Sequence, residues 1–218
     1  MRRWLHFAAA SVATITFTDS SVDQTDLTEY TFSTQAIGDA AADRKVVVCV
    51  HGGNNDATVA SLTVGGISAD LVVAKASGVG GSFFNENEIW QAIVPTGTTA
   101  DVVVTWSAGQ LECHIGIFAV YGAQSAAHAT ATDITDPLSQ SLAVPAGGVA
   151  IAFASIEEVR TFTWGAGITE QFDQTTSSRA TSTGASDAYA ADTTVTVAAT
   201  PSSSTTKIIL VAASWGPA

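Results

Sequence analysis

The stretch that decides the fold runs from Glu88 to Tyr121 and reads EIWQAIVPTGTTADVVVTWSAGQLECHIGIFAVY. Its apolar runs are separated by turn signals at 95–97 and at 108–109. In the middle run, Val102, Val104 and Trp106 share one face. An alternation of β-branched and aromatic residues with a period of two is typical of β-strands. We therefore expect three strands in this stretch, joined as an antiparallel meander in the middle of a sheet.

The same rhythm of short apolar runs and turn residues continues on both sides, and no helical stripe of useful length interrupts it. Gly65 and Gly66 form a two-residue hairpin signal, and 44–50 is apolar on both faces, as in a strand covered on both sides. Many short strands at this spacing favour an all-β, antiparallel β-sandwich, and a jelly roll of two packed sheets closes its edges well. We expect one such domain over 12–218, preceded by a short N-terminal arm over 1–11. Further strands are expected at 12–18, 27–32, 62–64, 67–75, 138–144, 149–156, 162–164, 168–172, 179–190, 193–199 and 207–215.

The charge balance excludes two classes of partner. The chain has 218 residues, 20 of them acidic and 8 basic, which gives a net charge of -12. Binding to nucleic acid depends on Lys and Arg that displace counterions from phosphate, so we expect no nucleic-acid partner. An anionic membrane surface is disfavoured for the same reason.

The N-terminal segment MRRWLHFAAASVA superficially looks like a signal peptide, but its apolar run is too short to span a bilayer. We interpret it as an arm that contacts a neighbouring subunit through Trp4 and Phe7, and we expect no membrane insertion. Trp215, near the C-terminus, is a third candidate assembly contact.

The two cysteines, Cys49 and Cys113, both lie in expected strands among aliphatic residues. Buried free thiols are the ordinary state of such residues. A disulfide is the alternative if the two strands are neighbours, and the sequence leaves this open.

No catalytic signature is complete. The strand that ends in His51, Gly52 and Gly53 resembles the oxyanion-hole segment of lipases and esterases, but no G-x-S-x-G follows. We therefore interpret the two glycines as a tight turn after a buried strand, and we expect no enzyme. Glu157 and Glu158 are adjacent, so in a strand they point to opposite faces, and we expect both to be exposed to solvent.

The sequence also lacks histidines and cysteines at the spacing of metal-binding motifs. The histidines at 6, 51, 114 and 128 are scattered, without H-x-x-x-H or C-x-x-C, so we assign no metal site and no cofactor. Calcium is the alternative, because acidic and amide side chains recur in expected loops. These side chains are Asp39, Asp43, Asn54, Asn55, Asp56, Asn85, Glu86, Asn87, Glu88, Asp133 and Asp136.

Aromatic side chains raise the alternative of carbohydrate binding, since indole rings stack on sugars. Trp106 is in phase with core valines, and core packing explains most aromatic residues of a sandwich. Trp164, beside Gly165 at the end of an expected strand, is the candidate glycan contact.

The second half of the chain carries a family resemblance. Its segments EIWQAIVPTGTTADVVVTW, HIGIFAVYGA, DPLSQSLAVPAGGVAIAFA, TFTWGAGITE, SDAYAADTTVTV and KIILVAASWGPA follow one another in order. This pattern of strands, turns and tryptophans, from about Val46 to the C-terminus, resembles small jelly-roll structural proteins of tailed bacteriophages and gene transfer agents.

The resemblance implies a non-enzymatic virion component, such as a capsid decoration, a spike or fibre module, or a tail protein. Its implied partners are other virion proteins of the coat or tail, and its implied state is a homo-oligomer or a lattice-bound subunit. A carbohydrate- or receptor-binding module that attaches to a host glycan is the alternative function.

Overall fold

The computed structural model describes residues 12–53, 57–77 and 85–218. The arm with Trp4 and Phe7 lies outside the described residues, so their predicted assembly contacts stay predictions. The described chain is all-β, and it contains no helix long and apolar enough to cross a membrane. The strands are β1 (Thr14–Asp23), β2 (Leu27–Ala36), β3 (Lys45–Gly53), β4 (Val59–Val64), β5 (Ile67–Ser68), β6 (Asp70–Ser77), β7 (Asn85–Ile93), β8 (Thr99–Gln110), β9 (Cys113–Tyr121), β10 (Ala129–Asp133), β11 (Leu138–Val144), β12 (Gly148–Ile156), β13 (Phe162–Trp164), β14 (Thr169–Thr175), β15 (Thr181–Tyr189), β16 (Thr193–Pro201) and β17 (Ile208–Trp215).

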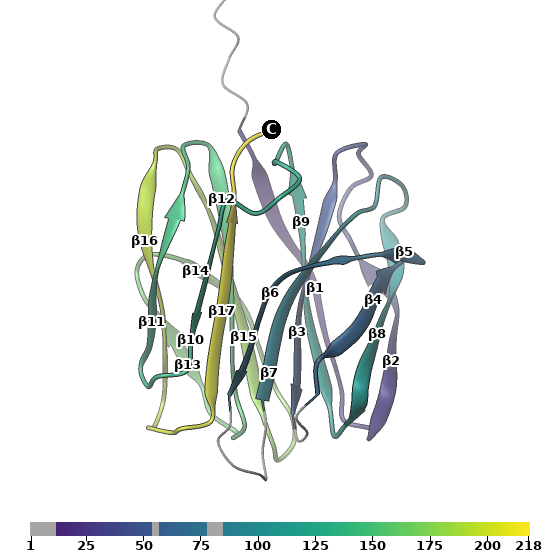
Figure 1. Ribbon diagram of the computed structural model, residues 1–218, viewed down its shortest axis with the longest axis vertical. Coiled ribbons are helices and arrows are strands. Elements are labelled where there is room, and N and C mark those ends of the chain that lie inside the picture. Colours follow the sequence, from purple (N-terminus) through teal and green to yellow (C-terminus); the bar gives the residue numbers. More distant parts are fainter. Residues whose placement is uncertain (1–11, 54–56, 78–84) are drawn as a thin grey trace, which may run out of the picture.

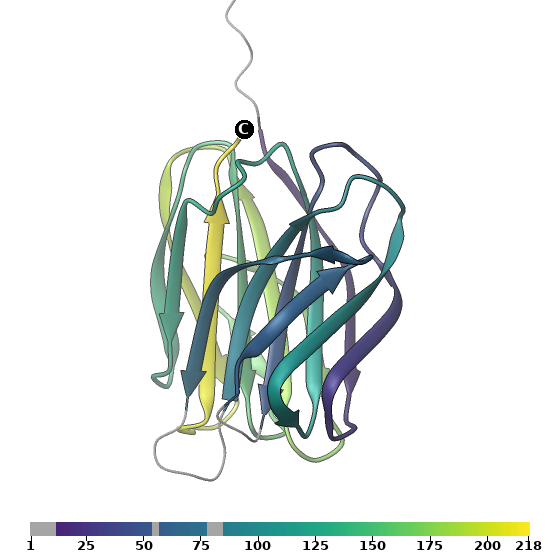
Figure 2. The ribbon, with the colours of Figure 1, turned by 45° about the vertical axis from the view of Figure 1, so that its right-hand side comes forward.

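These strands form four antiparallel sheets that stack as layers, which Figure 1 shows from right to left. Their strand orders are β2-β8-β4-β5, β1-β9-β3-β7-β6, β10-β17-β12-β15-β14 and β11-β16-β13. The first and last are outer sheets, and the middle two are inner sheets. In Figure 2 the strands of the first outer sheet run obliquely across those of the inner sheet that it covers. A separate hydrophobic cluster fills each space between neighbouring layers.

The two halves of the chain repeat one topology. In the first half β1 pairs with β9, β9 with β3 and β3 with β7, while β2, β8 and β4 form the outer sheet. In the second half β10, β17, β12 and β15 follow the same order, and β11, β16 and β13 form the outer sheet. This alternation between two sheets is the strand order of a jelly roll. The expected jelly-roll sandwich is therefore confirmed, but the chain builds it twice, with four sheets instead of two.

Each jelly roll has a core of its own, and a third cluster joins the two inner sheets. The description of 12–218 as one domain stays a prediction, since separate cores and a shared one are both present. Strand β12 shows how the layers are distinguished: Val149, Ile151 and Phe153 face the other jelly roll, whereas Ala150 and Ala152 face the core of their own. The predicted face of large apolar side chains and the predicted alanine face of this strand are both confirmed.

The opening stretch contains the three predicted strands but not the predicted meander. Strands β7 and β9 belong to the inner sheet, β8 belongs to the outer sheet, and β3 lies between β7 and β9. The chain crosses from one sheet to the other at each turn, and β7 and β9 are buried on both faces over most of their length. Val102, Val104 and Trp106 face the core, as their phase predicts.

Trp215 is completely buried, which corrects its assignment as an assembly contact. Its ring lies between the two jelly rolls, with the Lys45 ammonium 5.3 Å from the ring centroid. Its indole Nε1 donates a hydrogen bond of 2.9 Å to Gln91 Oε1 on the other jelly roll. The apolar C-terminal strand is thus used for contacts within the chain.

Both cysteines are buried free thiols, so the default prediction is confirmed. Strands β3 and β9 are neighbours, but Cys49 faces the cluster between the jelly rolls whereas Cys113 faces the core of the first. Side chains on opposite faces of one sheet cannot form a disulfide with each other.

Candidate functional site

The apolar interface between the two jelly rolls becomes polar at one end, the lower end in Figure 1, where β3 and β12 end and β9 and β17 begin. A row of cross-strand partners crosses each inner sheet at this level. On the first jelly roll the row consists of Asn87, His51 and His114. On the second it consists of Ser182, Ser155 and Ile209, at topologically equivalent strands. The repeat of the fold thus places the polar row of the first jelly roll opposite a row with two serines in the second.

Hydrogen bonds hold both imidazoles, His51 within its own sheet and His114 across the interface. The His51 Nδ1 lies 3.0 Å from Asn87 Oδ1, which also accepts a bond of 2.7 Å from the Ser155 hydroxyl. Because an amide oxygen only accepts, the proton of neutral His51 is assigned to Nδ1, and Nε2 keeps a lone pair. The His114 Nδ1 lies 2.8 Å from Ser182 Oγ. Each ring is therefore fixed through Nδ1, with Nε2 turned toward the same place.

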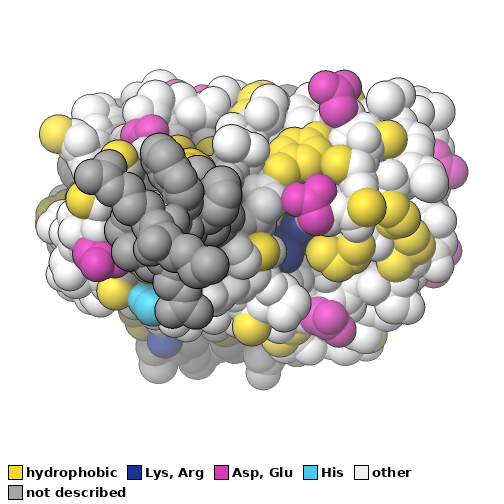
Figure 3. Space-filling view, turned by 90° about the horizontal axis from the view of Figure 1, so that it is seen from above, with side chains coloured by type: hydrophobic (Ala, Val, Ile, Leu, Met, Phe, Trp, Pro, Cys, Tyr) yellow, Lys and Arg dark blue, Asp and Glu magenta, His cyan; other side chains and the backbone are white. Residues whose placement is uncertain are grey.

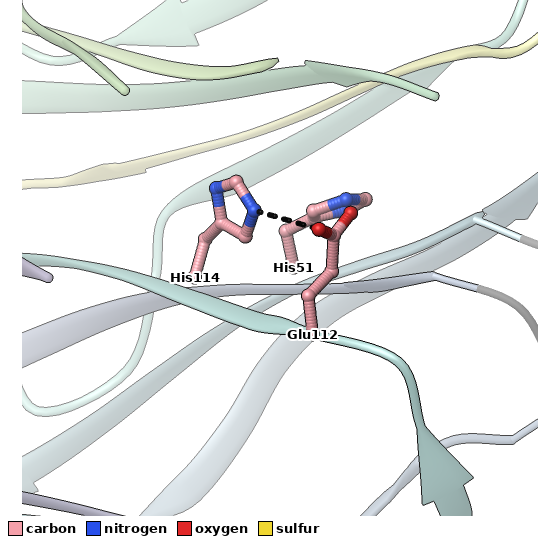
Figure 4. Close-up of side chains that lie close together, drawn as sticks. All are labelled: His51, Glu112 and His114. Carbon is pink, nitrogen blue, oxygen red and sulfur yellow. Dashed lines mark ion pairs between the residues drawn. The ribbon is translucent and has the colours of Figure 1, made fainter. Parts of the chain in front are cut away.

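Two carboxylates face these nitrogens. The Glu112 carboxylate points toward both imidazoles, with Oε2 at 3.9 Å from His114 Nε2 (Figure 4). Glu157, which follows β12 on the second jelly roll, places Oε1 at 3.9 Å from His51 Nε2. One nitrogen or oxygen from each of His51, Glu112 and His114 lies within 4.8 Å of the others.

The atoms that meet at this point are buried and have no hydrogen-bond partner. They are His51 Nε2, His114 Nε2, Glu112 Oε1, Glu112 Oε2 and Glu157 Oε1. Leaving a buried polar atom unpaired costs about 1–3 kcal/mol, and more for a charged group. Such atoms are rare in native structures, and several that converge call for a common partner, such as water or an ion.

Burial shifts the pKa values of several members of this cluster. Burial, with the nearby His114 acting in the same direction, lowers the pKa of His51 to about 3. Burial and the neighbouring Glu112 raise the pKa of Glu157 to about 7. Burial alone would raise the pKa of Glu112, but its contacts with His114 and His51 outweigh burial, so the net shift is downward.

Gly52 and Gly53 belong to strand β3, so their interpretation as a tight turn is wrong. A β-carbon at Gly52 would overlap the Trp106 ring, and one at Gly53 would overlap the carboxylate of Glu157. These glycines thus leave room for the side chains that pack directly against β3, and Gly53 allows Glu157 to reach His51.

A pocket of about 340 Å³ adjoins Glu157. Its lining residues are Leu111, Glu157, Ser178, Arg179 and Lys207. Glu157 therefore lies between the buried histidines and a cavity with two basic residues, and its side chain is only 8% exposed. The prediction that Glu157 is exposed is wrong, because the second jelly roll packs it against β3. Glu158 instead forms an ion pair of 2.6 Å with Arg160.

The structure also places the two other predicted sites, the glycan contact Trp164 and the calcium ligands. The Trp164 ring is half-buried, packs against the core of the second jelly roll and donates from Nε1 to Thr183 Oγ1 at 3.0 Å. Among the predicted calcium ligands, residues 54–56 lie outside the described chain, and 85–88 form a buried part of β7 and not a loop. Asp133 accepts hydrogen bonds from the backbone of its own loop. Glycan and calcium binding stay predictions.

Sequence reasoning missed the histidine cluster because His51 and His114 are far apart in the chain. Only the pairing of β3 with β9 makes them direct cross-strand neighbours, with ring centroids 5.0 Å apart. Two local signals were present: a histidine that ends an apolar strand, and the Glu112-x-His114 spacing, which permits two residues of one segment to reach one ligand.

No protein-family model matches this chain, and no curated protein matches it at a significant level.

Proposed function

We propose that this protein is a non-enzymatic structural component of a phage-like virion: a capsid decoration, a spike or fibre module, or a tail protein. It acts through protein–protein contacts, either with further copies of itself or with a coat or tail lattice. The observation that carries the proposal is the tandem jelly roll. Jelly rolls recur in viral capsid and lectin domains, although a fold does not by itself define a function.

The use of the sheet faces supports an assembly role. The inner sheets are covered on both sides within the chain, which makes a rigid four-layered body. The outer sheets and the edge strands remain available for neighbours. Rigid sandwiches of this kind work by presenting surfaces and loops to partners.

Exposed apolar side chains gather near one sheet edge. Ile67, Leu71 and Ile93 are 40%, 51% and 47% exposed, and Ile67 and Ile93 line a hollow of about 280 Å³ beside the edge strand β6. Seen from above, the molecule also presents scattered acidic side chains and few basic ones (Figure 3). Apolar patches near a sheet edge favour contacts with protein, and the acidic surface does not favour contacts with nucleic acid.

The alternative function is a carbohydrate- or receptor-binding module that attaches to a host glycan. Trp164 favours it, because its ring keeps an exposed part while its indole nitrogen is anchored to Thr183. A fixed, half-exposed indole is a suitable platform for a sugar ring.

The proposal is tested by quantitative mass spectrometry of density-purified particles from the source culture. We expect the protein at a fixed copy number relative to the major coat protein. A ratio near one would indicate a lattice-wide decoration, and a low ratio a spike or tail part. Its absence from particles would contradict the proposal and direct the work to glycan-binding assays with Trp164→Ala.

A matched pair of variants tests the apolar edge. Leu71→Asp lies on the edge strand β6, whereas Val159→Asp introduces the same charge at a residue that is 44% exposed on the second jelly roll. We expect Leu71→Asp to reduce incorporation into particles and Val159→Asp to leave it unchanged. Equal incorporation of both variants would show that this edge is not used.

A further inference from the structure

We propose that His51, Glu112, His114 and Glu157 bind one divalent transition-metal ion of the Zn²⁺ class, which links the two jelly rolls. The first three ligands come from β3, the β8–β9 connection and β9 of the first jelly roll, and Glu157 comes from the second. The ion would thus join two bodies that otherwise meet through an apolar cluster and a few hydrogen bonds. This inference is independent of any role in a virion.

The donor set selects the metal. Neutral imidazole nitrogens with carboxylate oxygens suit zinc and neighbouring transition metals, whereas calcium and magnesium prefer oxygen ligands alone. The His51 Nε2 carries a lone pair because Nδ1 donates to Asn87. The hydrogen bonds at both Nδ1 atoms are the outer contacts that metal-binding histidines usually make, and they orient the rings.

The geometry is close to that of a bound ion. In a tetrahedral site with metal–ligand bonds of about 2.0–2.2 Å, ligand atoms lie roughly 3.3–3.6 Å apart. Two of the contacts are 3.9 Å, and the three ligand atoms of His51, Glu112 and His114 lie within 4.8 Å of one another. Side-chain shifts of about 1 Å would bring the ligand atoms of His51, Glu112 and His114 to the spacing of a bound ion. Glu157 joins this group through its contact with His51 Nε2.

Burial explains why the site favours a cation. His51, Glu112 and His114 are at most 1% exposed, and every ligand atom of the set lacks a hydrogen-bond partner. Buried carboxyl and imidazole groups without hydrogen-bond partners are costly, and a divalent ion would satisfy all of these atoms.

The first experiment is a titration of the full-length protein, stripped of metal with a chelator, by Zn²⁺ in a calorimeter. We expect one equivalent to bind. At a free Zn²⁺ concentration of 100 times the dissociation constant, the folded-to-unfolded ratio rises about 100-fold. For a chain of this size the midpoint of thermal unfolding then rises by roughly 5–10 °C.

Variants locate the ion. His51→Gln and His114→Gln remove one nitrogen ligand each. His128→Gln is the matched control, because His128 is exposed and its backbone bonds to Ser214, at the opposite end of β17 from the ligands. We expect loss of the bound equivalent in the first two and full binding in the control. Glu157→Gln should weaken binding at least tenfold, and Ser182→Ala, which frees His114 Nδ1, should weaken it about 10–100-fold.

A measurement on the unmodified protein keeps the test decisive if a variant fails to fold. X-ray absorption of the zinc-loaded protein should show two imidazole nitrogens and carboxylate oxygens, and the cobalt-loaded protein should show the visible spectrum of a tetrahedral site. The proposal is overturned if the wild type binds no zinc at micromolar concentration, if binding survives in both histidine variants, or if the spectra show no imidazole ligand.

Discussion

The ring of Phe172 packs between the two jelly rolls, directly over two glycines. It extends from β14, and a β-carbon placed at either Gly116 or Gly184 would overlap its ring. Phe17 of the first jelly roll stacks on it at a centroid distance of 5.2 Å. Glycine is required at these two strand positions because any larger side chain would displace the ring from the interface.

Gly116→Ala is therefore expected to destabilise the protein by about 1–3 kcal/mol, because the added methyl group overpacks a buried aromatic contact. Chemical denaturation measures the change in the free energy of unfolding. Gly109→Ala is the control, since its nearest neighbour is the Asp26 carboxylate oxygen at 3.3 Å, the end of an exposed side chain. Equal stability of the two variants would contradict this account of Phe172.

Lys45 is a buried cation in the same interface, and its ammonium donates to the backbone carbonyl of Gln124. Burial lowers its pKa from 10.5 to about 8. Below pH 8 the folded protein carries the full cost of burying the charge. Between about pH 8 and 10.5 the folded state loses the proton while the unfolded state keeps it, so the free energy of unfolding rises with pH, by up to about 3 kcal/mol.

The measurement is the free energy of unfolding from pH 7 to 10.5 in the wild type and in Lys45→Met. Burial raises the pKa of the Cys49 and Cys113 thiols, which titrate with the opposite sign, so only the difference between the two proteins isolates Lys45. That difference should change in favour of the wild type as pH rises. A difference that is constant with pH would mean that Lys45 stays charged in the folded state.

At the scale of elements, the local turns follow their sequence signals closely. The β4–β5 hairpin has Gly65 and Gly66 at φ values of 58° and 77°, the left-handed pair of a type I′ turn. Such turns take Asn or Gly in the first position, whereas a β-branched residue in the second is strained.

Gly66→Val is expected to cost about 1–3 kcal/mol, since valine must adopt a left-handed conformation. Gly65→Asn keeps the preferred Asn-Gly sequence and is expected to be neutral within about 0.5 kcal/mol. Thermal unfolding of both variants checks the pair. If Asn at 65 proved as damaging as Val at 66, the turn type would be wrong.

At the scale of the whole molecule, the two jelly rolls share a large apolar cluster. Phe118 and Val47 of the first belong to the same cluster as Phe153 and Val211 of the second. A shared core couples the stability of the two halves, because separating them would expose this surface to water.

Unfolding of the metal-stripped protein is therefore expected to be a single cooperative transition, with equal calorimetric and van't Hoff enthalpies. Phe153→Ala, which opens a cavity in the shared cluster, should cost about 3–5 kcal/mol and lower the stability of both halves together. Two separate transitions in differential scanning calorimetry would show instead that each jelly roll unfolds independently.

The sequence by itself determined the local structure. Alternation predicted the strands from Val102 to Trp106 and from Val149 to Phe153, together with the faces that they bury, because side chains of a strand point to opposite sides. The Gly65-Gly66 turn and the buried free cysteines followed from equally local rules. Each of these features depends on residues adjacent in the chain.

Only the tertiary structure decided which sheet each strand joins, and with it the site. Nothing in the apolar runs around β8 indicates that β3 inserts between β7 and β9. The sequence pattern of a meander is therefore the same as that of a jelly roll. His51 meets His114 through that insertion, and Glu157 reaches them because the second jelly roll packs against the first. Strand pairing and sheet packing join residues distant in the chain, and hydrophobic periodicity carries no information about such pairs.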